Sequence, residues 1–174
     1  MPRLRRATVA VMQLSLLAGC AATRVESVAP AALAAPAGTR IVVTADATGT
    51  QDYVCAAGKD GAFAWTLRGP DAVLNDANGQ RLGRHFAGPT WEWRDGSQIV
   101  GALVTKADAP DAAAIPWLLL SVKEHHGAGV LGAVRFVQRL ATQGGKAPAD
   151  GCDAAHADRV TRVPYSARYV FLGS

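Results

Sequence analysis

Residues 81–106, RLGRHFAGPTWEWRDGSQIVGALVTK, decide the fold class of this chain. They contain three runs rich in β-branched and aromatic residues, Arg81–Ala87, Thr90–Trp93 and Gln98–Lys106, which are separated by Gly88-Pro89 and Asp95-Gly96. Asp-Gly tolerates a positive φ and favours a tight hairpin turn, and proline cannot donate an inner hydrogen bond of a sheet. The stretch is therefore typical of short antiparallel strands that follow one another as a meander.

The same pattern extends over the rest of the chain. Asp60-Gly61 and Asn78-Gly79 mark two more hairpin turns. The apolar run Trp117–Leu120 predicts a central strand that is covered on both faces. The other expected strands are Arg40–Ala45, Gln51–Cys55, Ala62–Leu67, Ala72–Asn75, Trp117–Glu124, Gly132–Thr142, Arg159–Val163 and Arg168–Leu172.

The best candidate for a helix is Val130–Ala141. Strand alternation fits it slightly better, because Val134, Phe136 and Leu140 then share one face, with Gln138 as the interruption. We therefore expect an all-β domain, an antiparallel β-sandwich or a barrel-like meander with little helix.

The N-terminus has the pattern of an export signal. Arg3, Arg5 and Arg6 precede an uncharged, largely apolar run, Ala7–Ala18. The run is too short to span a membrane as a helix, which needs roughly 20 apolar residues. It ends at Leu17-Ala-Gly-Cys20, which resembles the lipobox of bacterial lipoproteins.

This resemblance implies cleavage after residue 19 and lipid on Cys20, which would anchor the chain to a membrane. Ala21 in the second position of the mature chain implies sorting to the outer membrane, so the expected location is the bacterial cell envelope. The alternative is ordinary secretion in which Cys20 is discarded. The chain then divides into a signal peptide (residues 1–19), an Ala/Pro-rich tether (20–38), expected to be an extended spacer, and a single β domain (39–174).

Cleavage also changes the charge. The whole chain has 18 Lys and Arg residues against 14 Asp and Glu, a net charge of +4. Loss of Arg3, Arg5 and Arg6 leaves 15 against 14, a net charge of +1. The excess positive charge therefore belongs mostly to the leader, and nucleic acid is not an expected partner.

The chain has three cysteines. If Cys20 carries lipid, Cys55 and Cys152 remain as one even pair in an oxidising compartment, where a disulfide is expected. The alternative is two separate buried thiols.

The mature sequence resembles the family known as domain of unknown function 3455, which is found in exported bacterial and fungal proteins. The resemblance covers nearly the whole mature domain but implies no established activity, although some fungal members carry a dehydrogenase label. The motifs that carry it are Trp65-Thr-Leu67 with Gly69-Pro70, Gly88-Pro-Thr-Trp-Glu92, Asp95-Gly-Ser97 with Gly101, Ile115-Pro-Trp-Leu-Leu119, Val137-Gln-Arg139, Gly144-Gly145 with Ala147-Pro148, Gly151-Cys-Asp153 and Val163-Pro-Tyr-Ser166.

The dehydrogenase label can be tested against one motif. Gly127-Ala-Gly129-Val-Leu-Gly132 satisfies the G-x-G-x-x-G pattern of dinucleotide-binding proteins. That pattern binds pyrophosphate only where it opens a helix after a strand in a βαβ unit, and here it lies late in an all-β pattern. We therefore expect a hairpin turn at this site and no nicotinamide cofactor.

Metal and hydrolytic sites have little support. The histidines are His85, His125, His126 and His156, the last of them three residues after Asp153, and no spacing among them resembles a zinc site. We expect no metal and interpret the histidines as solvated loop residues. A secreted hydrolase that uses Glu92, Asp108 or a histidine is the alternative hypothesis; Ser97, Ser121 and Ser166 are available hydroxyls, but none lies in a Gly-x-Ser-x-Gly motif.

The sharpest local feature is Trp91-Glu92-Trp93, since the two indoles share one face of a strand and Glu92 points to the other. An exposed pair would stack on a sugar ring, whereas a buried pair would belong to the core. The candidate ligand-binding residues are therefore Trp91, Trp93, Glu92 and His85. The leading hypothesis is a noncatalytic envelope domain that binds carbohydrate or an envelope protein; a structural or stress-related envelope protein is a further alternative.

Overall fold

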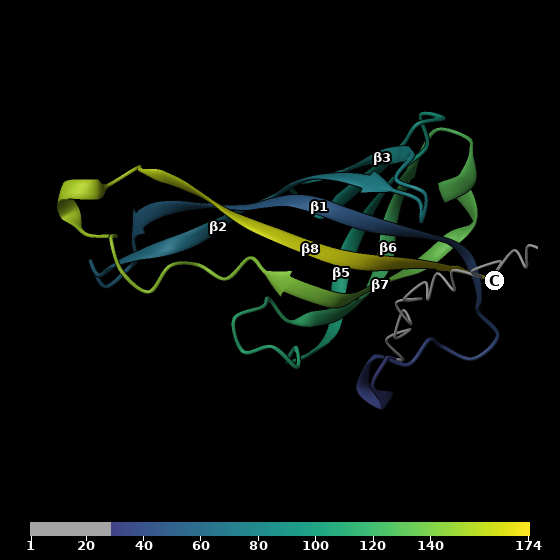
Figure 1. Ribbon diagram of the computed structural model, residues 1–174, viewed down its shortest axis with the longest axis horizontal. Coiled ribbons are helices and arrows are strands. Elements are labelled where there is room, and N and C mark those ends of the chain that lie inside the picture. The colour runs from purple at the N-terminus through teal and green to yellow at the C-terminus, as the bar shows by residue number, and fades with distance from the viewer. Residues whose placement is uncertain (1–28) are drawn as a thin grey trace, which may run out of the picture.

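The computed structural model describes residues 29–174, so the expected signal peptide and Cys20 lie outside the described residues. Eight strands form one closed antiparallel barrel, in which each strand pairs with the next and β8 closes the ring on β1 (Figure 1). The strands are β1 (Arg40–Ala57), β2 (Phe63–Asn75), β3 (Arg81–Phe86), β4 (Thr90–Trp93), β5 (Gln98–Ala107), β6 (Trp117–His126), β7 (Val134–Gly144) and β8 (Val160–Gly173). The expected all-β class is confirmed, and the architecture is a barrel.

Helical structure in residues 29–174 is confined to three short 3-10 turns, η1 (Ala31–Leu33), η2 (Val130–Ala133) and η3 (Ala154–His156). The alternative helix over 130–141 is therefore absent, and most of that segment forms β7. Within the described part of the chain, no helix is long and apolar enough to cross a membrane.

The strands β1, β2 and β8 are longer than the sequence predicts, because each joins two of the expected strands into one. Gly49 and Gly69 interrupt the expected apolar pattern but do not end their strands. A Cβ atom on Gly49 would lie 2.1 Å from the Asp71 carbonyl oxygen, so this glycine permits a close approach of β1 and β2. Gly49 therefore indicates two closely paired strands and not a turn.

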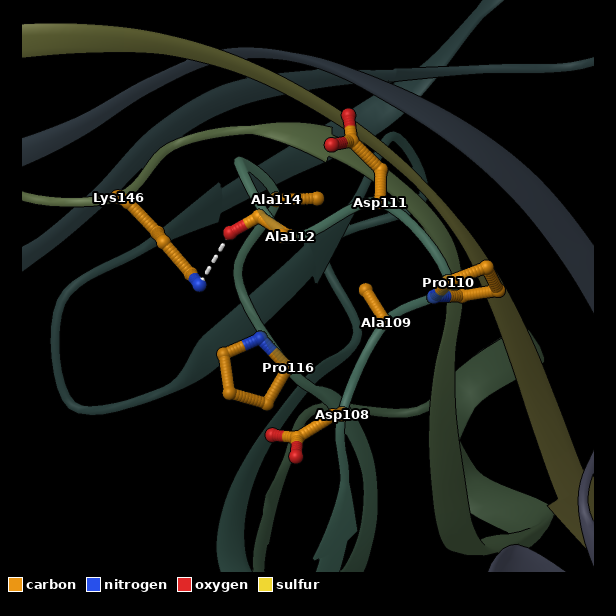
Figure 2. A pocket seen from close by; sticks show the side chains of 8 residues that line it. All are labelled: Asp108, Ala109, Pro110, Asp111, Ala112, Ala114, Pro116 and Lys146. Atoms are coloured by element: carbon orange, nitrogen blue, oxygen red, sulfur yellow. Dashed lines mark hydrogen bonds between the residues drawn. The ribbon is translucent and has the colours of Figure 1, made fainter.

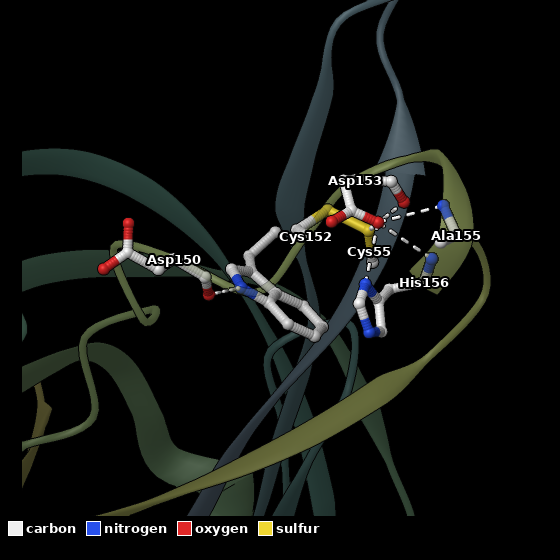
Figure 3. Close-up of a disulfide and its surroundings, with 7 residues drawn as sticks. Cys55, Asp150, Cys152, Asp153, Ala155 and His156 are labelled. Carbon is white, nitrogen blue, oxygen red and sulfur yellow. Dashed lines mark hydrogen bonds and ion pairs between the residues drawn. A yellow bond between two sulfur atoms is a disulfide. The ribbon is translucent and has the colours of Figure 1, made fainter.

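The three long strands project beyond the barrel as an arm, with β1 between β2 and β8 (Figure 1). A disulfide between Cys55 and Cys152 ties β1 to the loop before β8, so the expected disulfide is confirmed (Figure 3). The Trp65 indole of β2 donates to the Asp150 carbonyl of the same loop at 2.9 Å. The arm is therefore closed by the disulfide, by this side-chain contact and by backbone hydrogen bonds of Cys55 with Asp158 and Arg159.

Alternate side chains of each strand fill the barrel, as the period of a strand requires. Its centre is aromatic: Trp91 packs against Tyr169 and Phe171 with ring centroids 5.5 and 6.2 Å apart. One end is closed by Leu131 of η2, which is fully buried in the same cluster. The other end lies where the arm leaves the barrel, and it is lined by polar side chains.

A second apolar cluster covers the outside of the barrel over β6, β7 and β8. Leu33 of η1, which belongs to the segment expected to be a tether, is fully buried there against Trp117, Leu119 and Leu140. The Gln138 amide donates to the Leu33 carbonyl at 2.6 Å. Residues 31–33 therefore form a strap on the barrel, and the apolar outer face expected for Trp117–Leu120 is explained by this cover.

Candidate functional site

The polar end of the barrel contains a cavity of about 340 Å³. Small-molecule sites occupy clefts of roughly 300–1,000 Å³ and are common in the mouths of β-barrels. Residues from six of the eight strands meet here, together with the turn between β3 and β4. The lining residues that matter for chemistry are Gln51, His85 and Arg139 at the floor and Leu67, Leu103 and Leu118 at the rim.

Gln51 is placed in this cavity by the alternation of β1. Inward positions of the strand run through Ala45, Ala47 and Gly49 to Gln51, so the amide replaces the apolar side chain that the pattern predicts. The side chain is only 2% exposed. Its Nε2 atom has no hydrogen-bond partner of good geometry among residues 29–174, and the one side chain it acts on there is the Tyr165 hydroxyl. A buried donor without an acceptor costs about 1–3 kcal/mol, so this position is costly unless something else occupies it.

His85 lies beside it on β3 and is fully enclosed. Its ring stacks on Trp91 with centroids 4.5 Å apart and an interplanar angle of 8°. Burial lowers the pKa of His85 to about 3, so the ring is neutral at physiological pH. The carbonyl of Thr90, 2.8 Å from Nδ1, can only accept a hydrogen bond, so Nδ1 carries the proton and Nε2 is left as an acceptor.

Arg139 of β7 brings a positive charge to the same floor. Its Nε and Nη2 atoms donate to the Pro116 carbonyl at 3.1 and 2.8 Å, which fixes the guanidinium against the loop before β6. Tyr165 and Tyr169 of β8 back this region. Burial is the main effect on both hydroxyls and raises the pKa of each, while the Arg139 charge opposes it. The guanidinium is therefore close enough to act on both phenols.

The rim of the cavity is open to solvent and largely apolar, with the exposed Arg68 as its one charged residue. Leu67 of β2 is 53% exposed and Leu103 of β5 is 58% exposed, which is unusual for leucines in a closed barrel. The site thus combines a polar, enclosed floor with an apolar mouth. This arrangement suits a molecule that has one polar end and an apolar body.

Of the two alternatives for Trp91 and Trp93, an exposed platform or part of the core, the structure shows the core. The two side chains are 1% and 5% exposed and lie in the barrel core, Trp93 against Phe171 with centroids 5.7 Å apart. The two indoles do share one face of β4, as predicted, but closure of the barrel turns that face inward. Neither ring is available to stack on a sugar, whereas His85 does line a cavity.

Glu92 and Asp108 do not form an acid and base pair. Glu92 lies on the outside of β4, where Arg84 binds both carboxylate oxygens at 3.0 and 3.1 Å and lowers the pKa of the glutamate. It pairs with Gln98 at the start of β5, whereas Asp108 follows the end of that strand. Ten residues of strand separate them by about 30 Å.

Asp108 itself lines a second, smaller cavity of about 270 Å³ outside the barrel. Figure 2 shows Asp108 and Asp111 at opposite ends of it, with the Lys146 ammonium bound to the Ala112 carbonyl between them. The lysine holds the loop between β5 and β6 against the chain that follows β7. The contacts of Lys146 therefore fix the position of this loop.

The remaining histidines are distributed over separate places. His125 and His126 end β6, and His156 donates from Nδ1 to Asp153 at 2.7 Å near the disulfide (Figure 3). That hydrogen bond is the main cause of the lowered pKa of Asp153. In the part of the chain that the structure describes, no three His, Cys, Asp or Glu side chains gather in a way that would hold a metal ion.

The G-x-G-x-x-G segment forms the connection between β6 and β7, so its context is that of a turn. Asp95 Oδ2 accepts the Val130 amide at 2.8 Å, and Ser97 Oγ accepts the Leu131 amide at 3.2 Å. Gly129 has a φ of 149°, and a Cβ there would lie 2.4 Å from the Asp95 carboxylate. The glycines allow the loop to close the barrel end, and no βαβ unit surrounds them.

Sequence reasoning missed Gln51, Arg139, Tyr165 and Tyr169 as site residues. A signal for two of them existed: Gln51 and Arg139 are polar residues at inward positions of otherwise apolar strands. It was not decisive, because the same sequence places Gln138 on the outer face, where it binds the strap. The two cases differ only in whether the side chain points into the barrel or to its outside.

Comparison with known proteins gives one match. Residues 36–173 match the family described as protein of unknown function (DUF3455). The chain matches no curated protein and no solved structure. Because the match covers the whole barrel and the arm, this chain belongs to the DUF3455 family.

Proposed function

We propose that this protein is a noncatalytic binding domain of the bacterial cell envelope, which takes a small molecule into the open end of its barrel. Lipid on Cys20 would hold it to a membrane, most simply the outer membrane. The observation that carries the binding proposal is the cavity of about 340 Å³ whose floor contains the buried, unpartnered Gln51 amide. A ligand that accepts a hydrogen bond there would recover the cost of burying that donor.

The same floor argues against hydrolysis. No carboxylate and no serine line the cavity, and His85 is neutral with Nδ1 committed to a backbone carbonyl. A general acid and base pair needs two titratable groups near the reacting atoms. The lining supplies hydrogen bonds, one cation at the floor and apolar surface, which are the means of binding.

Binding at the barrel mouth is tested with a neutral apolar fluorescent probe, N-phenyl-1-naphthylamine. We expect saturable binding at one site. Leu103→Trp should reduce it at least tenfold, because a larger ring at the rim blocks the mouth. Val104→Trp is the matched control, since Val104 is also exposed, at 55%, but does not line the cavity. Equal binding by both variants, or no binding by the wild type, would favour a structural envelope protein instead.

The anchor is tested separately by mass spectrometry of the mature protein expressed in a bacterium with its own leader. We expect a chain that begins at Cys20 and carries acyl groups. Cys20→Ser should give a protein without lipid that leaves the membrane fraction. An unmodified chain that begins elsewhere would contradict the lipoprotein proposal without affecting the cavity.

A further inference from the structure

We propose that the ligand of the barrel is an amphipathic oxyanion. Its charged head would bind Arg139 and Gln51 at the floor, and its apolar body would lie along Leu67, Leu103 and Leu118. This inference rests on the proposed function and names the chemical class of the ligand.

The first support is a charge without a counter-charge. Arg139 is half-buried, and its hydrogen-bond partners, the Pro116 carbonyl and the Tyr169 hydroxyl, are both neutral. None of the ion pairs found among residues 29–174 includes it. The cavity lining contains Arg139 and Arg68 and no Asp or Glu. A partly desolvated cation is normally paired, so the missing partner is expected to be an anion from outside.

The second support is the excess of donors. Gln51 Nε2 is buried, and its residue lines the cavity. This atom has no hydrogen-bond acceptor of good geometry among residues 29–174. Arg139, which lines the same cavity, adds guanidinium hydrogens. A carboxylate or sulfate is an acceptor at every oxygen and satisfies several donors at once, and a charge-assisted hydrogen bond is roughly twice as strong as a neutral one.

The third support is the order of the groups along the cavity. Gln51 and His85 are each 2% exposed, whereas the leucines at positions 67 and 103 are more than half exposed. This order favours binding of the charged end at the floor and of the apolar part at the leucines of the mouth, where the exposed Arg68 is a second cation. The cavity of about 340 Å³ falls within the roughly 300–1,000 Å³ of small-molecule sites.

The test is displacement of the neutral probe by molecules of one chain length: decanoate, decyl sulfate, decan-1-ol and decyltrimethylammonium. We expect at least one anion to bind about tenfold to a hundredfold more tightly than the alcohol, the range that a hydrogen bond to a charged group provides. Which anion binds better distinguishes a carboxylate head from a sulfate head. This part of the experiment uses the wild-type protein alone.

Variants then assign the head-group contact. Arg139→Gln should remove the preference of anion over alcohol, and Arg139→Lys should retain part of it. Arg135→Gln is the control on the same strand, because that arginine is exposed and does not line the cavity. Gln51→Leu should weaken anion binding several-fold while leaving alcohol binding within about twofold. Circular dichroism melts identify any variant that is unfolded.

The outcomes separate the two proposals. If the probe binds but the alcohol or the ammonium competes as well as both anions, the oxyanion inference is wrong and the binding site stands. If the Arg139→Gln and Arg135→Gln variants lose anion binding equally, the head is not bound at the floor. If the probe itself does not bind, the proposed function fails and the inference fails with it.

Discussion

His85 combines a titratable ring with complete burial, and its charge state follows from its surroundings. The ring lies between Trp91 and Tyr169, 4.5 and 5.0 Å from their centroids, with one nitrogen on the Thr90 carbonyl. Burial disfavours a positive charge on the ring, and the Arg139 charge disfavours it further. Its role in the fold is therefore that of a neutral aromatic ring with one hydrogen bond.

The first prediction concerns pH. Burial lowers the pKa of His85 from 6.5 to about 3, so the unfolded chain takes up a proton at a pH where the folded chain does not. The free energy of unfolding should be unaffected by His85 above pH 6.5. Between pH 6.5 and 3 it should fall by up to about 1.4 kcal/mol per pH unit.

Urea denaturation at several pH values checks this. His85→Phe keeps a ring that cannot be protonated, so its stability should depend less on pH between 6.5 and 4 than that of the wild type. Val104→Ala, at an exposed position without a titratable group, is the control and should leave the slope unchanged. Equal slopes for the wild type and His85→Phe would show that the buried ring does not contribute.

The second prediction separates two glycines of one motif. Gly129→Ala should lower the free energy of unfolding by about 1–3 kcal/mol, because its φ of 149° strains any side chain and the Asp95 carboxylate fills the space. Gly132→Ala should change it by less than about 0.5 kcal/mol, since nothing lies within 4 Å of the added Cβ. Chemical denaturation of both measures the difference. Equal losses would contradict this account of the loop.

At the scale of elements, the barrel depends on a segment that is not part of it. The strap, residues 31–33, covers apolar side chains on the outside of β6, β7 and β8. The family match begins at residue 36, so Leu33 lies before the matched segment. Any free spacer that links Cys20 to the domain therefore ends before the strap.

The third prediction is that Leu33→Ala destabilises the domain by about 2–4 kcal/mol, because it removes a fully buried leucine and leaves a gap over the outer face. Urea denaturation of the mature chain without lipid measures it. Val104→Ala, at an exposed position, is the control and should cost less than about 0.5 kcal/mol. A loss as small as that of the control would mean that the strap detaches freely.

At the scale of the whole molecule, the disulfide joins residues 97 positions apart and closes the arm rather than the barrel. The barrel core lies at a distance from it along β1. The disulfide therefore constrains the unfolded chain strongly. In the folded chain it lies at the tip of the arm formed by β1, β2 and β8. Loss of the disulfide should therefore lower the stability of the whole domain but reduce local order mainly in the arm.

The fourth prediction follows from this. A loop of about 100 residues corresponds to as much as about 4.7 kcal/mol in the chain-entropy account, so the Cys55→Ala and Cys152→Ala double variant should melt at a clearly lower temperature. Hydrogen exchange should show the largest loss of protection in the arm, residues 51–57 and 160–164. Unchanged melting under reducing conditions would contradict the prediction.

The sequence by itself determined the all-β class and the turn at the glycine-rich motif, because both follow from local geometry: alternation and hairpin dipeptides. It predicted the pairing of Cys55 with Cys152 only on the condition that Cys20, the third cysteine, carries lipid. It did not determine that Gly49 and Gly69 lie within strands, since a glycine that ends a strand and one that admits a neighbouring backbone look the same along the chain.

Only the tertiary structure decided which face of each strand points inward. Ring closure buried Trp91 and Trp93, which alternation alone left equally free to face solvent. It also brought Gln51, His85 and Arg139 together from β1, β3 and β7. These residues are far apart in the sequence, and a site made from single residues of distant strands leaves no spacing to recognise. The fold class was therefore a local property, and the binding cavity was a property of the closed barrel.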